Sequence, residues 1–416
     1  MRSLIIADVS PMLASDGAHR GSKRRDLFIS AICSISDEVE VAFYASADGI
    51  AALGALAPHE AMLSDAWGLP VRLNPIPDRS RQATIWNHYV TGAFSAAEQQ
   101  GYQAFSGPDQ VRGVARSLER EPDLVLASRF QAACALPHAR MRTTRFFFDM
   151  MDIEHKIRLR TVLSAPVRAG TPLYMAQIPA LLLAERRVVR MAEATFVCSE
   201  QDQQHLRRLG FGGRIEVIPN AMPIPAQAAP ATQEPTVLYL GTYSYMPNRE
   251  AADRLIRHIW PLIRQEVPEA RLIIAGKGPE RIPSFGSAGP GVAFTGFVDD
   301  LDQLYGRSRV VACPIMVGGG TRLKLVEAAS YGRPMVSTRI GAEGLHFAAE
   351  QEILLRDDDA GFARACRPTP AATGPGRCRA AGSETATTRP PRTRPPRRRS
   401  QRGRWSATPP PAALQA

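Results

Sequence analysis

The chain of 416 residues has the composition of a globular protein, with 44% hydrophobic and 22% charged residues, and it is long enough for two α/β domains. Its net charge of +11 is concentrated at one end, because 11 of the 51 basic residues but only one of the 40 acidic residues lie in residues 367–416. The rest of the chain is nearly neutral, which argues against a nucleic-acid-binding protein. No stretch approaches the roughly 18 uninterrupted apolar residues of a membrane span. The six scattered cysteines lack metal-binding spacing, so we expect a reducing, cytoplasmic location and no metal site.

Short apolar runs alternate with helical patterns through the first half of the chain, which is typical of a parallel α/β sheet. The expected strands are residues 4–7, 39–44, 124–127, 145–148, 194–198 and 216–218. The expected helices include residues 24–34, 174–192 and 201–209. We interpret residues 1–222 as a Rossmann-like domain.

Residues 223–235 contain four prolines and no periodicity, which predicts an interdomain linker. A second α/β series follows and predicts a second Rossmann-like domain over residues 236–366. Its expected strands are residues 236–240, 271–275, 292–295, 310–314, 334–337 and 352–355. Its expected helices include residues 249–266 and 321–331. Two such domains bind a ligand in the cleft between them, at the carboxyl ends of the strands.

Residues 367–416 hold ten prolines and eleven arginines, with no Asp, Lys, Ile, Val, Phe or Met, so we expect a disordered tail. A helical pattern begins at residues 359–364 and is then replaced by this composition. This change in composition is typical of a shifted reading frame through GC-rich DNA. We favour a frame shift over a native basic tail. In that case the second domain is truncated.

The most informative segment, residues 318–324, reads GGGTRLK and joins an apolar strand to a helix. Consecutive glycines let main-chain N–H groups approach an anion, and a helix N-terminus attracts one. Arg322 and Lys324 add two cations in the first turn, where they oppose the helix dipole unless an anion lies between them. The pattern therefore predicts a bound phosphate. The alternative is a purely structural turn in which Glu327 pairs with Lys324. The remaining candidates in the segment are Gly318, Gly319, Gly320 and Thr321.

Two segments of the first domain are predicted to face the cleft. Asp149 and Asp152 follow the strand at residues 145–148, so their carboxylates are expected to point into the cleft. The alternative for Asp152 is a helix cap, and we interpret His155 and Glu185 as exposed helical residues. The other segment is the basic, glycine-containing loop after the first strand. The alternative interpretation is a solvated basic loop with no role in the cleft. The candidates in this segment are Gly17, Arg20 and Gly21.

Residues 310–338 resemble the donor-binding motif of retaining GT-B glycosyltransferases of group 1, the GT4-like family. Further motifs similar to those of this family are VIPNA at 217–221, LYLG at 238–241, PNR at 247–249, AGKGP at 275–279 and FTGFVD at 294–299. The resemblance covers residues 1–365. It implies two facing Rossmann-like domains, with Glu327 binding the ribose of a nucleoside-diphosphate sugar and with Arg322 and Lys324 binding its diphosphate. It also implies that Gly241 closes over this donor and that Lys277 and Val298 lie beside the base.

The sequence departs from the family pattern at Gly319, where the first of two glutamates usually stands and contacts the transferred sugar. The sugar therefore cannot be inferred. The resemblance implies transfer to a glycan or lipid-linked acceptor in cell-surface or exopolysaccharide synthesis. It also implies that residues 1–222 form the acceptor-side domain, in which Asp149 or Asp152 orients the acceptor hydroxyl. It further implies retention of configuration, no metal or other cofactor, and peripheral association with the inner face of the membrane. The alternative is an impaired transferase that retains only nucleotide binding, because the helix that usually braces the first domain is missing.

Overall fold

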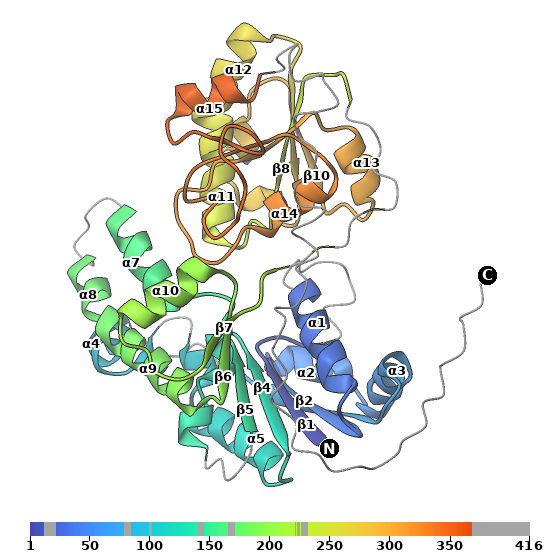
Figure 1. Ribbon diagram of the computed structural model, residues 1–416, viewed down its shortest axis with the longest axis vertical. Coiled ribbons are helices and arrows are strands. Elements are labelled where there is room, and N and C mark those ends of the chain that lie inside the picture. The colour runs from blue at the N-terminus through green and yellow to red at the C-terminus, as the bar shows by residue number, and fades with distance from the viewer. Residues whose placement is uncertain are drawn as a thin grey trace, which may run out of the picture.

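The computed structural model describes residues 1–11, 22–78, 85–99, 102–139, 145–164, 171–220, 222, 225 and 232–367. Within these residues the chain forms two parallel sheets, of seven and six strands, each flanked by helices. The lobe built on the second sheet lies beyond the carboxyl ends of the first sheet (Figure 1). The predicted fold class, two facing Rossmann-like α/β units, is confirmed. The predicted linker lies mostly outside the described residues, as does the predicted tail beyond Arg367.

The first sheet has the order β3-β2-β1-β4-β5-β6-β7, and all its neighbouring strands are parallel. Its strands are β1 (Arg2–Ala7), β2 (Glu38–Ala45), β3 (Val71–Pro77), β4 (Leu124–Ser128), β5 (Arg145–Asp149), β6 (Ala194–Val197) and β7 (Ile215–Val217). The helices around it are α1 (Ser22–Cys33), α2 (Ala47–Leu53), α3 (Ala57–Trp67), α4 (Ile85–Phe94), α5 (Pro108–Leu118), α6 (Phe130–Ala133), α7 (Glu154–Ser164), α8 (Thr171–Ala176), α9 (Ile178–Met191) and α10 (Glu200–Arg208).

The first sheet is buried on both faces because its central strands are apolar throughout. In β1, Leu4 and Ile6 belong to one core cluster, whereas Ile5 and Ala7 belong to another. Alternate residues of a strand point to opposite faces, so this division assigns one core to each side of the sheet. Helices α5 and α9 contribute to the first core, and α1 and α3 contribute to the second.

The second sheet repeats the same winding, with the order β10-β9-β8-β11-β12-β13 and parallel neighbours. Its strands are β8 (Thr236–Leu240), β9 (Arg271–Ala275), β10 (Val292–Gly296), β11 (Val310–Cys313), β12 (Met335–Ser337) and β13 (Leu354–Leu355). Its helices are α11 (Met246–Arg254), α12 (Trp260–Glu266), α13 (Leu301–Gly306), α14 (Leu323–Ser330) and α15 (Asp359–Ala365).

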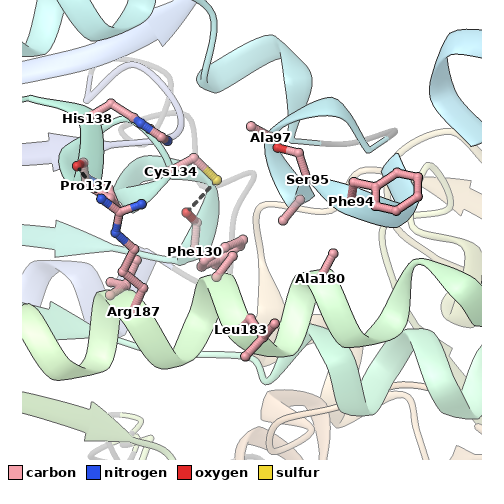
Figure 2. Close-up of a pocket in the computed structure, with 13 residues that line it drawn as sticks. Phe94, Ser95, Ala97, Phe130, Cys134, Pro137, His138, Ala180, Leu183 and Arg187 are labelled. Carbon is pink, nitrogen blue, oxygen red and sulfur yellow. Dashed lines mark hydrogen bonds between the residues drawn. The ribbon is translucent and has the colours of Figure 1, made fainter. Parts of the chain in front are cut away.

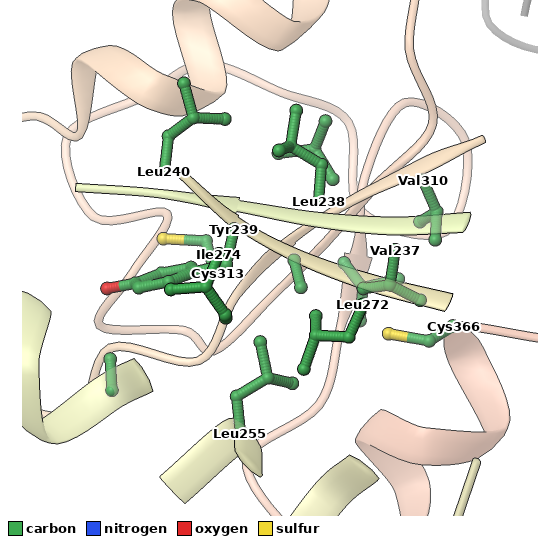
Figure 3. Packing of buried hydrophobic residues seen from close by; sticks show 14 of the residues in the cluster. Val237, Leu238, Tyr239, Leu240, Leu255, Leu272, Ile274, Val310, Cys313 and Cys366 are labelled. Atoms are coloured by element: carbon green, nitrogen blue, oxygen red, sulfur yellow. The ribbon is translucent and has the colours of Figure 1, made fainter. Parts of the chain in front are cut away.

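The core of the second domain gathers the side chains of β8, β9 and β11 (Figure 3). Helix α15, the last described element, packs into it: Phe362 is fully buried, and Cys366, just after the helix, is also buried. Asp358 caps this helix by accepting from the main-chain N–H of Gly361. Residues up to Arg367 therefore belong to the second domain.

Three elements differ from the sequence prediction. Strand β3 was missed because Pro75 and Pro77 interrupt its pattern, but it is an edge strand, where proline is tolerated. The helix expected at residues 174–192 is two helices, since the second starts at Ile178 with Pro179 in its first turn. The helix expected at residues 249–266 contains a π turn over Leu255–Ile259, just before Pro261.

Candidate functional site

Both sheets reverse their strand order at one point, and the glycine loop that leaves the reversal point of the second sheet contacts the first domain. The order reverses between β1 and β4 in the first sheet and between β8 and β11 in the second. Arg160 Nη1 of the first domain donates to the carbonyl of Gly318 at 3.1 Å, and Asn220 Nδ2 donates to Thr321 Oγ1 at 2.7 Å. Because doubly wound sheets bind ligands where the order reverses, this junction is the candidate site.

The glycine loop after β11 lies directly against the first domain. Gly318 has φ 134° and Gly320 has φ 63°, both in the region that favours glycine. A Cβ on Gly319 would lie 2.6 Å from Ile157 Cγ1, and a Cβ on Gly320 would lie 2.7 Å from Asp152 Oδ1. Side chains at these positions would push the two domains apart.

Arg322 stands at the N-cap of α14 and folds back over the glycine loop. The residue is 9% exposed, and its Nη1 donates to the carbonyls of Gly319 and Gly320. Its Nη2 lies beside Gly318 and has no hydrogen-bond partner among the described residues. A buried guanidinium N–H without a partner is costly, so an anion at this position would stabilise it.

Lys324 lies in the same turn and is 6% exposed. Its Nζ donates to Asn248 Oδ1 at 2.9 Å and lies 4.1 Å from the ring centroid of Tyr239. Asn248 also packs against Gly241, where a Cβ would lie 3.0 Å from the amide carbon Cγ, and Gly276 packs its main chain onto Gly241. The turns after β8 and β9 therefore support the position of Lys324.

The predicted ribose ligand, Glu327, is buried on α14. Its Oε2 accepts from the Tyr305 hydroxyl at 2.8 Å, and the Tyr305 ring stacks on Tyr331 with centroids 4.3 Å apart. In this structure the carboxylate of Glu327 therefore faces Tyr305, within the second domain.

The two predicted base-pocket residues lie near the carboxyl end of β10. Lys277 Nζ lies 4.7 Å from the ring centroid of Phe297, which is 38% exposed. Val298 is half-buried and packs against the core of the domain. Phe297 precedes Val298 in the FTGFVD motif, and its exposed ring provides a surface on which a base can stack.

The first domain contributes a cluster of charges from the ends of three strands. Arg129, which sequence analysis missed, follows β4 and has φ 74°, an uncommon value for a residue other than glycine. Its Nη1 donates to Asp8 Oδ2 at 2.9 Å, and its Nη2 lies 3.8 Å from Asp152 Oδ2. Because Asp8 and Arg129 are 121 residues apart, no local motif identifies the pair.

Asp149 is fully buried and does not face the cleft. Arg24 Nη2 pairs with its Oδ1 at 2.7 Å, and Ser128 donates to its Oδ2 at 3.2 Å. Burial raises the pKa of Asp149, although the charge of Arg24 opposes the shift. The structure therefore gives Asp149 a structural contact in place of the predicted exposure to an acceptor. The other acceptor-side candidates lie outside the described residues: Gly17, Arg20 and Gly21.

His155 and Glu185 are buried, contrary to the sequence interpretation. Glu185 is 0% exposed and accepts from His155 Nδ1 and from the main-chain N–H groups of Glu154 and His155, so it caps α7. His155 Nε2 in turn lies 3.0 Å from His205 Nε2. The arginines that flank Glu185 in the sequence gave the impression of a solvated helix face.

A second charged network joins the domains. Lys156 Nζ lies 3.1 Å from Glu343 Oε1 and 2.9 Å from Asp202 Oδ1, and Arg160 pairs with Glu343 through both ends of its guanidinium. Burial alone raises the pKa of Glu343, but the hydrogen bonds from Arg160 and the charge of Lys156 outweigh it and lower this pKa to about 2. Glu343 is therefore ionised, and its ion pairs connect α7 to the second domain.

A pocket of about 240 Å³ lies elsewhere on the first domain, between the end of α4, the segment from α6 to residue 138, and α9 (Figure 2). Phe94, Phe130 and Leu183 are among its lining side chains, and Arg187 donates to the carbonyl of Pro137 at one side. None of the predicted site residues lines this pocket, so it is separate from the junction of the two domains.

In the described part of the chain, no helix is both long enough and apolar enough to span a bilayer. No three His, Cys, Asp or Glu side chains there are grouped so that they could hold a metal ion.

Comparison with known proteins identifies both halves of the chain. Residues 36–221 match the family model described as glycosyl transferase 4-like domain, and residues 234–368 match the one described as glycosyl transferases group 1. A comparison with curated proteins gave no match.

Solved structures with the same fold cover most of the chain. A sucrose-phosphate synthase from Thermosynechococcus elongatus aligns with 16% identity and a TM-score of 0.58 over 88% of each chain. HepE from Anabaena, in complex with UDP-glucose, aligns with 16% identity and a TM-score of 0.56, also over 88% of each chain. A glycosyltransferase from Rickettsia africae aligns with 11% identity and a TM-score of 0.51 over 87% of this chain and 86% of the other. The chain belongs to the group 1 glycosyltransferases and has the GT-B arrangement of two facing parallel sheets.

Proposed function

We propose that this glycosyltransferase takes its sugar from a nucleoside-diphosphate sugar held mainly by the second domain. The acceptor is a hydroxyl of a glycan or lipid-linked glycan that the first domain presents. The family resemblance implies this acceptor class, a role in cell-surface or exopolysaccharide synthesis, and work at the cytoplasmic face of the membrane.

The observation that carries the proposal is the buried guanidinium of Arg322. Its Nη2 has no hydrogen-bond partner among the described residues and lies beside Gly318. Lys324 adds a second buried cation in the same helical turn. A diphosphate is an anion that can satisfy both cations and the glycine main chain at once.

Three further observations agree with a nucleotide sugar. The site lies where the order of the second sheet reverses, which is where sheets of this winding hold nucleotides. The exposed ring of Phe297 and the carboxylate of Glu327 lie on the same domain. The structure of HepE, which shares the fold, contains UDP-glucose.

The chemistry follows from the charges. The bond between the anomeric carbon and the diphosphate oxygen breaks, and the acceptor oxygen forms a new bond to that carbon while its proton passes to the departing diphosphate. Negative charge builds on the leaving diphosphate, and we assign its stabilisation to Arg322, Lys324 and the glycine N–H groups. We propose that these groups act without a bound metal and that the transfer retains configuration, as the resemblance implies.

Thermal unfolding of the chain with UDP, GDP, UDP-glucose and GDP-mannose tests the proposal, together with an assay of nucleotide release. We expect at least one nucleoside diphosphate to raise Tm, and its sugar ester to release nucleotide at a rate that EDTA does not change. Binding without turnover would identify an impaired transferase. If no nucleotide in the panel raises Tm, the proposed donor class is wrong.

A further inference from the structure

One carboxylate of the first domain lies against the glycine loop of the second. Asp152 Oδ1 lies 2.7 Å from the Cβ position of Gly320 and 3.8 Å from that of Gly319. Asp152 is half-buried, and it follows β5 at the junction of the two domains. A ligand group that extends from this loop toward the first domain therefore meets Asp152.

Position 319 itself has no room for a carboxylate side chain. Ile157 of α7 fills the space beside Gly319, with Cγ1 and Cδ1 at 2.6 and 2.8 Å from the Cβ position. A glutamate at that position would place its carboxylate oxygens about 3.5 Å from its Cβ, two C–C bonds and one C–O bond away. Asp152 Oδ1, at 3.8 Å, therefore supplies a carboxylate at a similar distance from the opposite domain.

Arg129 forms an ion pair with Asp152. The guanidinium of Arg129 lies between Asp8 and Asp152, at 2.9 and 3.8 Å. Its main chain is held in the left-handed region, and its N–H donates to the carbonyl of Asp149 at 2.9 Å. Backbone strain of this kind is kept where the surrounding structure enforces it, and it concentrates at functional sites.

The charge and hydrogen-bonding capacity of a carboxylate determine which ligand groups Asp152 can bind. An ionised carboxylate only accepts hydrogen bonds and repels phosphate, so a diphosphate on the glycine loop is not its ligand. In a nucleoside-diphosphate sugar, the group attached to the far phosphate is the sugar, whose hydroxyls are donors. A hydroxyl that donates to a carboxylate makes a charge-assisted hydrogen bond.

We propose that Asp152, oriented by Arg129, binds hydroxyl groups of the sugar that is transferred and helps to select it. This inference rests on the proposed donor class. It assigns Asp152 to the donor sugar instead of the acceptor hydroxyl expected from the sequence. It also predicts a neutral sugar with free hydroxyls, because a uronic acid would bring a third carboxylate beside those of Asp8 and Asp152.

Calorimetric titration of Asp152→Asn tests the proposal, with UDP-glucose and UDP as probes, or GDP-mannose and GDP if the wild type binds only guanine nucleotides. The quantity of interest is the ratio of the Kd for the nucleotide sugar to the Kd for the nucleotide. We expect Asp152→Asn to raise this ratio about tenfold, because a hydrogen bond to a charged group is lost. The nucleotide alone should bind as it does to the wild type, which shows that the variant is folded. Asp65→Asn, the same change on the exposed surface of α3, should leave the ratio unchanged.

Monodeoxy sugar nucleotides give a readout that a structural defect would not produce. At least one of them should bind the wild type more weakly than the parent sugar nucleotide, and this difference should disappear in Asp152→Asn. Arg129→Ala should reproduce the raised ratio, and Arg129→Lys should recover part of it. An unchanged ratio in Asp152→Asn would overturn the proposal while leaving the donor class intact. Failure of the wild type to bind any nucleotide would instead contradict the proposed function.

Discussion

The two halves of the site are built in opposite ways. The second-domain half is one continuous segment, glycines 318–320 with Arg322 and Lys324, and its buried charge is positive. The first-domain half is assembled from the ends of three strands, and there Arg129 lies between two carboxylates. This difference indicates that the second-domain half is suited to an anion and the first-domain half to neutral hydroxyl groups. These are the two ends of a nucleotide sugar.

The largest effect should come from the buried network that supports the first-domain half. Glu185→Ala removes the cap of α7 and leaves His155 without its carboxylate, so we expect the free energy of unfolding to fall by about 3–5 kcal/mol. Urea unfolding followed by circular dichroism measures this change. Glu216→Ala, at an exposed ion pair with Arg214, should cost less than 1 kcal/mol by the usual range for surface pairs. Equal losses in the two variants would show that the network does not stabilise this half.

Arg322→Ala tests the other half through catalysis. Removal of a preorganised group that stabilises developing negative charge should cost on the order of 2–4 kcal/mol of transition-state stabilisation, measured from kcat/KM. Lys324→Ala should behave similarly, whereas Arg271→Ala, at an exposed arginine of β9, should retain wild-type turnover. Near-wild-type rates for Arg322→Ala would remove this residue from the site.

Glu343→Gln tests the connection between the halves. The pKa of Glu343 lies below its ordinary value of 4.5, at about 2, so its ion pairs stabilise the folded state above pH 4.5 and lose this effect as the pH falls toward 2. We expect the substitution to cost about 1 kcal/mol at pH 7 after solvent screening. The difference in Tm between wild type and variant should therefore shrink as the pH is lowered from 5 to 3. A difference that stays constant with pH would contradict the assignment.

The smallest effect should be at the exposed aromatic ring of the second-domain half. Phe297→Ala should weaken binding of UDP by about 0.5–1 kcal/mol, because the base loses its stacking surface. Phe285 is a matched control, since it is 39% exposed compared with 38% for Phe297 and lies in the same domain. Equal Kd values for UDP in Phe297→Ala and Phe285→Ala would place the base elsewhere.

The fold and the second-domain half could be predicted from the sequence because their signals are local. Most strands appear as short apolar runs, and the glycine loop is one unbroken motif between β11 and α14. Strand β3 was missed because its two prolines interrupt the strand pattern. They are tolerated because β3 lies at the edge of the sheet.

The first-domain half could not be predicted because tertiary packing creates it. Arg129 is recognised as part of this half only through its hydrogen bond to Asp8, which is 121 residues away in the sequence. Glu185 and His155 lie among charged residues in the sequence, and only the packing of α7 on α9 buries them. Asp152 was identified as a cleft residue, but its proximity to Gly320 depends on how the two domains meet.

The most direct test of the account compares UDP with uridine as ligands of the wild type and of Arg322→Ala, by isothermal titration calorimetry. The glycine loop and its cations are assigned to the diphosphate, so Arg322→Ala should raise the Kd for UDP at least about tenfold, as the loss of a charge-assisted hydrogen bond would. The Kd for uridine, which lacks phosphates, should not change. If UDP binds both proteins equally, or if uridine loses as much affinity as UDP, the loop does not hold the diphosphate.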